Sequence, residues 1–151
     1  MEQFFSKLNY ITNGEGLTDI TEDLNLFIQK SNFHSGILNL TSLHTSCSLT
    51  INENADPNVL IDLKKFIKSI VPYKCYSSLS KDSEEIYYEH FQEGEDDMPA
   101  HIKTALTNTN LALSFQKGEI LLGTWQAIYL WEHRLSSKER SISVHIIGEK
   151  N

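Results

Sequence analysis

The stretch "EGEDDMPAHIK", residues 93–103, gathers side chains that suit acid–base or metal chemistry: four carboxylates precede a Met-Pro pair, and a histidine follows it. Pro99 suits the first turn of a helix, and Asp96 or Asp97 can cap the open N–H groups there. If that helix begins just before Pro99, Asp97 and His101 stand one turn apart on the same side. Two explanations remain open: a capped surface helix with solvated acids, or carboxylates gathered around a cation.

Five histidines fall in or beside polar patches on otherwise apolar segments. Any one of them alone is better explained as a hydrogen-bonded or surface residue than as a ligand. The run Glu132-His133-Arg134 is different because it ends a strongly apolar segment, so these three ionisable groups are expected to face a pocket or solvent. The five histidines are His44, His90, His101, His133 and His145.

Imidazoles and carboxylates without a nearby pair of thiols favour a site for a borderline divalent ion such as Zn²⁺, with an open position for water or substrate. The preferred ligands are His44, His101 and His133. Asp97 serves as a fourth ligand or as the acceptor that orients an imidazole. No HExxH-type spacing supports this set, because its histidines come from distant segments, so the prediction needs the fold to bring them together.

The composition limits the class of protein. A formal charge of −7 argues against a nucleic-acid partner, which normally needs a basic face. No apolar run approaches the roughly 18 residues of a membrane span, and the N-terminus lacks the features of a signal peptide, so we expect a soluble cytoplasmic protein with no membrane partner. Cys47 and Cys75 have no paired spacing and are expected to be free thiols. P-loop and serine-hydrolase chemistry are disfavoured, because their motifs are missing.

The N-terminal half predicts elements that position these groups. Segment 3–12 suggests a strand, and the apolar stripe over about 18–31 suggests a helix. A clearer helix follows Asp56, a capping residue with a proline next to it. Residues 36–54 alternate apolar and polar side chains, which predicts strands with one buried and one hydrophilic face, broken near Thr45 by a turn or bulge.

The C-terminal third repeats the strand pattern, with a hairpin turn at Lys117-Gly118, a strand that is apolar on both faces, and an alternating strand. No repeat, low-complexity tract or linker interrupts the chain. We therefore expect one α+β domain over residues 1–151, with about six or seven mostly antiparallel strands and two or three helices.

Four stretches together resemble the YjbQ (UPF0047) family, members of which are also described as secondary thiamine-phosphate synthases. They fall in the family's order and span roughly residues 36–149. The resemblance implies a sandwich-like α+β fold, a homotrimer, and one pocket per subunit near the subunit boundary. It also implies a transferase that joins a pyrimidine diphosphate to a thiazole phosphate. The four stretches are "HTSCSLTINENADPNVLIDL", "YYEHFQEGEDDMPAHIKTAL", "LLGTWQAIYLWEHR" and "SVHIIGE".

The resemblance carries over site residues from three of these motifs. One departure is Trp131, where relatives often have cysteine or a small residue, so a mechanism that uses a thiol at this position is not expected here. The carried-over residues are His44, Asn52 and Glu53 from the first motif; His90, Asp97, His101 and Lys103 from the second; and Thr124, Trp125, Gln126, Glu132, His133 and Arg134 from the third.

A site for that reaction needs cations for the phosphates and a flat wall for a ring. Arg134 and Lys103 are the candidate cations, and Trp125 is the candidate wall. Each also has a structural explanation. Arg134 can pair with Glu132 at the surface, Lys103 can be a solvated helix residue, and Trp125 can be a core aromatic.

Two functions remain open. One is a metal-assisted enzyme acting on a small phosphorylated or heterocyclic substrate, in which His101, His133, Asp97 and Glu132 carry the catalysis. The other is a non-catalytic trimeric protein that binds a metal or a small ligand, which a fully closed coordination shell would indicate. The substrate-binding set of the enzyme is Arg134, Lys103, Trp125, Thr124, Gln126, Asn52, Glu53 and His90.

Overall fold

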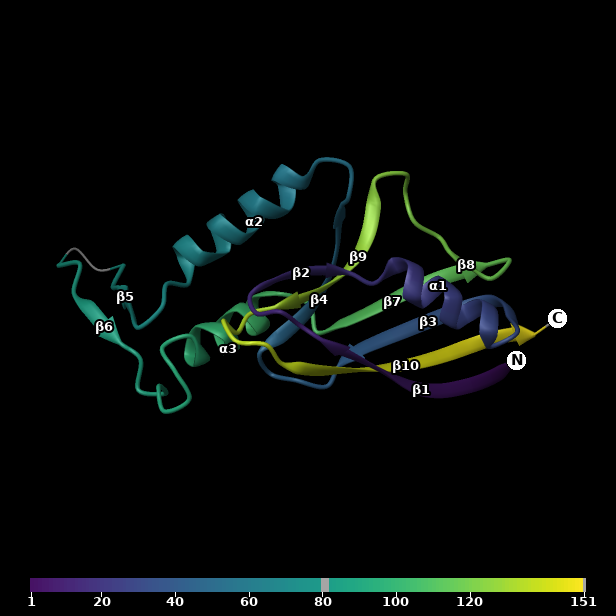
Figure 1. The fold of residues 1–151 in the computed structure, drawn as a ribbon, viewed down its shortest axis with the longest axis horizontal. Coiled ribbons are helices and arrows are strands. Elements are labelled where there is room, and N and C mark those ends of the chain that lie inside the picture. The colour runs from purple at the N-terminus through teal and green to yellow at the C-terminus, as the bar shows by residue number, and fades with distance from the viewer. Residues whose placement is uncertain (80–81, 151) are drawn as a thin grey trace.

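The computed structural model describes residues 1–79 and 82–150, and within them the chain forms ten strands and three helices (Figure 1). The α+β class is confirmed, but the expected number of strands was too low. Three strands of three or four residues were missed, because such short segments show no periodicity. The hairpin turn predicted at Lys117-Gly118 is confirmed, since Gln116 pairs with Glu119 across it. The elements are β1 (Glu2–Ile11), β2 (Gly16–Asp19), α1 (Thr21–Lys30), β3 (Phe33–Ser42), β4 (Cys47–Glu53), α2 (Pro57–Ile70), β5 (Cys75–Ser77), β6 (Glu85–Tyr87), α3 (Asp97–Leu106), β7 (Asn110–Gln116), β8 (Glu119–Ile120), β9 (Gln126–Glu132) and β10 (Glu139–Lys150).

A five-stranded antiparallel sheet in the order β1-β10-β3-β7-β8 forms one layer. β1 pairs with β10 along its whole length, so the two ends of the chain lie together (Figure 1). Alternate residues of β10 point into the core, where Ile142, Val144 and Ile146 are fully buried. Leu24 and Ile28 of α1 belong to the same core, since the apolar stripe of that helix faces the sheets.

A second sheet, in the order β2-β9-β4, packs against the same core. The chain leaves β3 at Ser42 and enters β4 at Cys47, so the break predicted near Thr45 is confirmed and carries the chain between the two sheets. Ser46 and Ser48, predicted on a hydrophilic face, are only 8% and 0% exposed. α3 packs against β4, and Ser46 and Ser48 lie in a polar interior rather than in water.

The helix starts were predicted with mixed success. α2 begins as expected, because the Asp56 carboxylate accepts a hydrogen bond from the N–H of Asn58 at 2.9 Å. α3 begins at Asp97, and Asp96 occupies the cap position without a side-chain capping bond. The predicted capping role of these two carboxylates is therefore wrong. Both are held instead by Arg134, which lies far away in the sequence.

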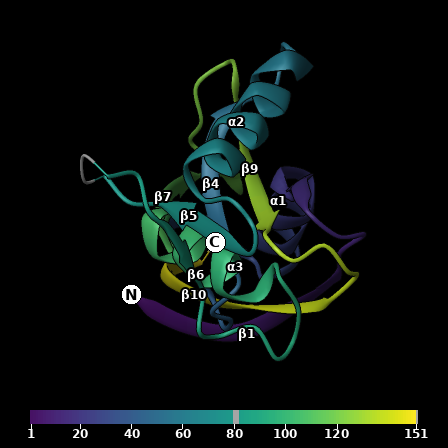
Figure 2. The same ribbon diagram turned by 90° about the vertical axis from the view of Figure 1, so that its left-hand side faces the viewer.

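α2, β5 and β6 form an arm that extends away from the two sheets (Figure 1), and in the end-on view α2 rises above the rest of the chain (Figure 2). Ile67 is the buried residue of α2, while Phe66 and Ile70 are 65% and 52% exposed. Over the described residues, no helix combines the length and apolar character that a membrane crossing requires. A single domain over residues 1–151 stays a prediction, and residues 80, 81 and 151 of it lie outside the described residues.

Candidate functional site

Two histidines and one aspartate, here called the His–Asp cluster, lie at the start of α3. That helix places Asp97 and His101 one turn apart, as their spacing predicted, and the loop between β6 and α3 brings His90 beside them. The Nε2 atom of His90 lies 2.8 Å from Asp97 Oδ2, and the Nε2 atom of His101 lies 3.5 Å from Asp97 Oδ1. One potential ligand atom from each residue lies within 4.8 Å of the other two, which suits a shared metal ion.

The hydrogen bonds of His101 decide which of its nitrogens can bind a cation. Its Nδ1 atom lies 2.8 Å from the carbonyl oxygen of Thr45, which can only accept a hydrogen bond, so Nδ1 carries the proton. In the neutral ring, Nε2 is then a lone pair that faces the Asp97 carboxylate. Two acceptors that face each other repel unless a proton or a cation lies between them. A backbone carbonyl that accepts from the other ring nitrogen is also usual for metal-binding histidine.

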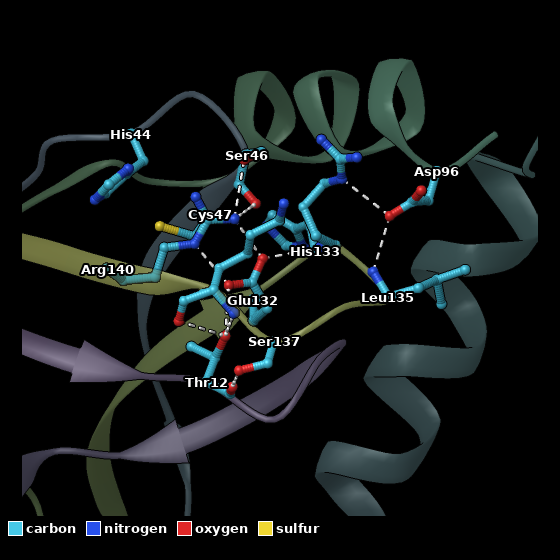
Figure 3. Close-up of polar contacts among 12 residues, drawn as sticks. Thr12, His44, Ser46, Cys47, Asp96, Glu132, His133, Leu135, Ser137 and Arg140 are labelled. Carbon is cyan, nitrogen blue, oxygen red and sulfur yellow. Dashed lines mark hydrogen bonds and ion pairs between the residues drawn. The ribbon is translucent and has the colours of Figure 1, made fainter. Parts of the chain in front are cut away.

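Arg134 holds the aspartates at the start of α3. It is 5% exposed and donates from Nε to Asp96 Oδ2 at 2.9 Å and from Nη1 to Asp97 Oδ1. The backbone N–H of Leu135 also donates to Asp96, at 2.8 Å (Figure 3). Burial alone raises the pKa of Asp96, but these hydrogen bonds outweigh it and keep that pKa below its usual value. The guanidinium therefore offsets the crowding of the acids, and the predicted surface ion pair of Arg134 with Glu132 is wrong.

Glu132 and Arg140 form a second buried ion pair, with exposures of 1% and 4%. Arg140 donates from Nε and Nη2 to the two carboxylate oxygens at 2.6 and 2.5 Å, and Thr12 adds a hydrogen bond at 2.9 Å (Figure 3). Burial raises the pKa of Glu132, but the hydrogen bonds outweigh it and lower the pKa overall. Glu132 does not face a pocket or solvent as predicted, because Arg140 of β10 is its partner inside the protein.

His133 is also buried, at 0% exposure, so its prediction as a pocket residue is wrong. Its Nε2 atom lies 2.8 Å from Ser48 Oγ, and its Nδ1 atom has no hydrogen-bond partner among the described residues. Burial and the nearby charge of Lys103 lower the pKa of His133 to about 4. His133 is therefore neutral near pH 7 and lies outside the His–Asp cluster.

Lys103 is fully buried rather than solvated. Its Nζ atom donates to Glu15 Oε1 at 2.5 Å, and the hydroxyl of Tyr73 donates to the other carboxylate oxygen at 2.7 Å. Burial raises the pKa of Glu15, but these hydrogen bonds outweigh it and lower the pKa overall. Lys103 thus links α3 to Glu15, just before β2, and through Glu15 to Tyr73, which lies between α2 and β5. The charge of Lys103 is already paired.

Another group of predicted residues lies at the opposite end of β9 from the run Glu132-His133-Arg134. In the pairing of β4 with β9, Glu53 lies opposite Gln126, whereas Cys47 lies opposite Glu132. Trp125 is 64% exposed just before β9, so it is not a core aromatic. This distal group does not join the His–Asp cluster within one chain. Its members are Asn52, Glu53, Thr124, Trp125 and Gln126.

His44 lies near the cluster without joining it. Its Nε2 atom accepts a hydrogen bond from the backbone N–H of Ser141 at 2.7 Å, and burial lowers its pKa. His44 lies on the loop between β3 and β4, on the same side of Glu132 as Ser46 (Figure 3). Of the four predicted metal ligands, Asp97 and His101 therefore meet, and His90 joins them in place of His44 and His133.

Two pockets adjoin the cluster, one beside each of its histidines. The aromatic pocket, about 270 Å³ in volume, includes His90, and the threonine pocket, about 490 Å³, includes His101. Neither pocket was predicted from the sequence, although the run of aromatic residues around His90 was a visible signal for the first. The aromatic pocket is lined by Lys74, Tyr87, Tyr88, His90, Phe91 and Glu95. Side chains lining the threonine pocket include His44, Thr45, His101, Thr104, Thr107 and Thr109.

Comparisons with known proteins agree on one family. A model described as "UPF0047 protein YjbQ-like" matches residues 6–149. The UPF0047 protein sll1880 of Synechocystis is 41% identical over 138 residues, 91% of this chain and 87% of the relative. The YjbQ protein of Escherichia coli O157:H7 is 41% identical, over 85% of each chain. Among solved structures, the conserved hypothetical protein TT1486 of Thermus thermophilus has a TM-score of 0.76 at 30% identity, over 94% of this chain and 99% of its own.

Proposed function

Because the chain belongs to the UPF0047 protein YjbQ-like family, as its motifs predicted, we propose that it is a metal-assisted enzyme acting on a small heterocyclic or phosphorylated substrate. One observation carries the proposal. Nδ1 of His101 is committed to the carbonyl oxygen of Thr45, so the Nε2 lone pair is turned toward the carboxylate of Asp97 and the nearby His90. This arrangement favours a cation in the space between the three side chains.

The donor set fits zinc. Two imidazoles and one carboxylate are ligands that Zn²⁺ accepts, and three protein ligands leave a position for substrate, as catalytic sites do. A zinc ion there would supply a Lewis acid for a substrate oxygen. Arg134 holds Asp97 through Oδ1, and this fixes the carboxylate before any ion arrives. These three ligands alone do not complete the coordination shell of a zinc ion, which argues against a purely structural zinc site.

The substrate side of the proposal follows from the aromatic pocket. Tyr87, Tyr88 and Phe91 line it beside His90, and such walls bind flat rings. The cations first assigned to phosphate groups, Arg134 and Lys103, are both buried in internal ion pairs. The heterocyclic part of the substrate is thus better supported than the phosphorylated part. Thiamine-phosphate synthesis remains the proposed reaction that the family resemblance suggests.

The metal proposal is tested by zinc content and zinc affinity of purified protein. We expect His90→Gln and His101→Gln each to weaken zinc binding by more than about tenfold. Even the substitution of a residue that only orients a metal ligand lowers metal affinity by that factor. His145→Gln is the matched control, because that ring stacks on Phe5 instead of joining the cluster. Full zinc affinity in both cluster variants would remove the proposed metal site.

The reaction is tested separately. Zinc-loaded protein, with His101→Gln as its control, is given the pyrimidine diphosphate and the thiazole phosphate, and product is followed with time. Product that forms only with the unchanged protein supports a thiamine-phosphate synthase-like transferase. Zinc binding without any turnover would favour the alternative, a non-catalytic protein that binds a metal or a small ligand.

We also propose that the chain assembles as a homotrimer in the cytoplasm. The exposed Phe66 and Ile70 of the projecting arm support assembly, because apolar side chains at this density mark contact surfaces. In such an assembly, the distal group around Trp125 would be able to contact a pocket of another subunit. Light scattering should give three chains for the natural protein and fewer for Phe66→Asp, while Lys65→Asp on the same helix stays trimeric. A monomeric natural protein would exclude this arrangement.

A further inference from the structure

Two cations near the His–Asp cluster are already committed inside the protein. Arg134 holds Asp96 and Asp97, and Lys103 donates to Glu15. Both cationic side chains are buried, so neither is free to bind a group in a pocket. A phosphorylated substrate therefore needs another cation, one that the internal ion pairs do not use.

Lys74 is the one lysine or arginine among the described residues that line the two pockets beside the cluster. It is exposed, and its ammonium group forms no ion pair or hydrogen bond with another described residue. Its backbone is held on both sides. The Lys74 N–H donates to the carbonyl oxygen of Glu95 at 3.3 Å, and the Lys74 carbonyl oxygen accepts from the N–H of Tyr88 at 3.2 Å. The main chain is therefore fixed while the ammonium group is available to a ligand.

The ammonium group lies beside the aromatic wall of its pocket. Lys74 and Tyr88 flank the pairing of Cys75 with Tyr87, so they lie at the same end of the β5–β6 hairpin. Glu85 raises the pKa of the Tyr87 hydroxyl, and the charge of Lys74 partly offsets that rise, as a nearby cation does. A ring bound against this wall therefore has a cation at the edge of its pocket.

The threonine pocket suits an anion less well. Its described lining residues include no lysine or arginine. Thr104 and Thr107 come from the end of α3 at which the backbone carbonyl groups form the negative pole of the helix. The aromatic pocket adjoins the opposite end, because Glu95 lines it two residues before α3 begins. We therefore expect a phosphate group in the aromatic pocket.

We propose that Lys74 binds the phosphate group of the substrate, while the ring lies against the aromatic wall next to the His–Asp cluster. This inference rests on the proposed function, from which it takes the aromatic pocket and the cluster, and it names the residue that selects a phosphorylated ring. Glu95 lines the same pocket and repels an anion, so it opposes Lys74. Removing either charge should therefore change phosphate affinity in opposite directions.

The test compares the pyrimidine diphosphate and the thiazole phosphate with the two alcohols that lack the phosphate groups, by isothermal titration calorimetry. Each compound is given alone, so no product can form. Lys74→Gln should weaken at least one phosphorylated ring about tenfold and leave the alcohols unchanged, because a charge-assisted hydrogen bond is lost. Lys74→Arg should keep most of the affinity, and Glu95→Gln should raise it. Lys7→Gln, at an exposed position of β1 outside the pocket, is the matched control.

A salt series separates a phosphate contact from a structural effect. The difference between the natural protein and Lys74→Gln should shrink as ionic strength rises, because salt screens an exposed charge. The inference is overturned if Lys74→Gln leaves both phosphorylated rings unchanged, if it weakens the alcohols equally, or if neither phosphorylated ring binds.

Zinc binding judges the proposed function separately. The titrations are run with and without added zinc, and Lys74→Gln should keep full zinc affinity, because Lys74 is not part of the cluster. Intact zinc binding without any effect of Lys74→Gln leaves the metal proposal standing and removes only the inference. An effect of Lys74→Gln in a protein that binds no zinc supports the phosphate contact and removes the metal proposal.

Discussion

Acidification to about pH 5 is expected to destabilise the fold through His133. This imidazole is fully buried, and Lys103, Glu132, Glu15 and Arg140 are the charged groups that influence it. Burial, followed by the Lys103 charge, lowers its pKa from 6.5 to about 4. The unfolded chain therefore takes up a proton below about pH 6.5, while the folded chain resists protonation until about pH 4. The contribution of neutral His133 to the stability of the fold is complete above about pH 6.5 and is lost as the pH falls from there to about pH 4.

The size of the loss follows from the two pKa values. With about 6.5 in the unfolded chain and about 4 in the folded one, proton linkage gives about 2 kcal/mol between about pH 7.5 and about pH 5. The pKa of His44 is also lowered, first by burial, so it adds to the loss in the same direction. The carboxylates of Asp96, Glu132 and Glu15 have lowered pKa values and lose their contribution to stability only at lower pH.

The assay is urea unfolding at several pH values, followed by tryptophan fluorescence. Trp131 is a suitable reporter, because it is 6% exposed and its ring centre lies 5.2 Å from that of His133. His133→Gln keeps a polar partner for Ser48 and cannot take up a proton, so its stability should fall by less than about 1 kcal/mol over the same pH range. His145→Gln, a change at a partly exposed ring, should keep the full dependence.

A direct titration guards against a variant that does not fold. The ring signals of His133 in the natural protein, followed by NMR, should show no protonation above about pH 5. If His133 titrates near its ordinary value, or if His133→Gln and the natural protein lose stability equally, burial does not suppress protonation here and the reasoning is refuted.

Further changes probe the supports of the site. Gly14→Ala should lower the free energy of unfolding by about 2 kcal/mol or more, because φ of Gly14 is +94° and a Cβ atom would lie 2.4 Å from the carbonyl oxygen of Leu135. Thermal unfolding measures this loss, and an unchanged melting temperature would contradict the prediction. Lys103→Met should cost about 3 kcal/mol, because it leaves Glu15 partly buried without its partner. Adding Glu15→Gln should recover part of that loss in urea unfolding, and no recovery would mean that the ion pair is not the cause. Arg134→Lys should weaken zinc binding about tenfold by loosening Asp97, with Lys138→Arg as a control away from the aspartates, and calorimetry would show equal affinities if the guanidinium does not position the carboxylate.

Local spacing was enough to predict some of the site and the family. Asp56 caps α2 because a capping residue and its helix are neighbours in the chain, and Asp97 meets His101 because one helical turn fixes their distance. The four motifs in their order were enough for the family, which the comparisons confirm. These features depend on a few consecutive residues, so the sequence alone determined them.

Only the tertiary structure determined which charged side chains are available to bind a ligand. Arg134 looked like a phosphate binder, but it pairs with Asp96 and Asp97, and Lys103 pairs with Glu15. In each pair the partners lie 37 or more residues apart, so their distance depends on how the sheets and α3 pack. The same packing buries His133. A charged group removed from water must find a partner or give up its charge, and the fold decides which of these happens.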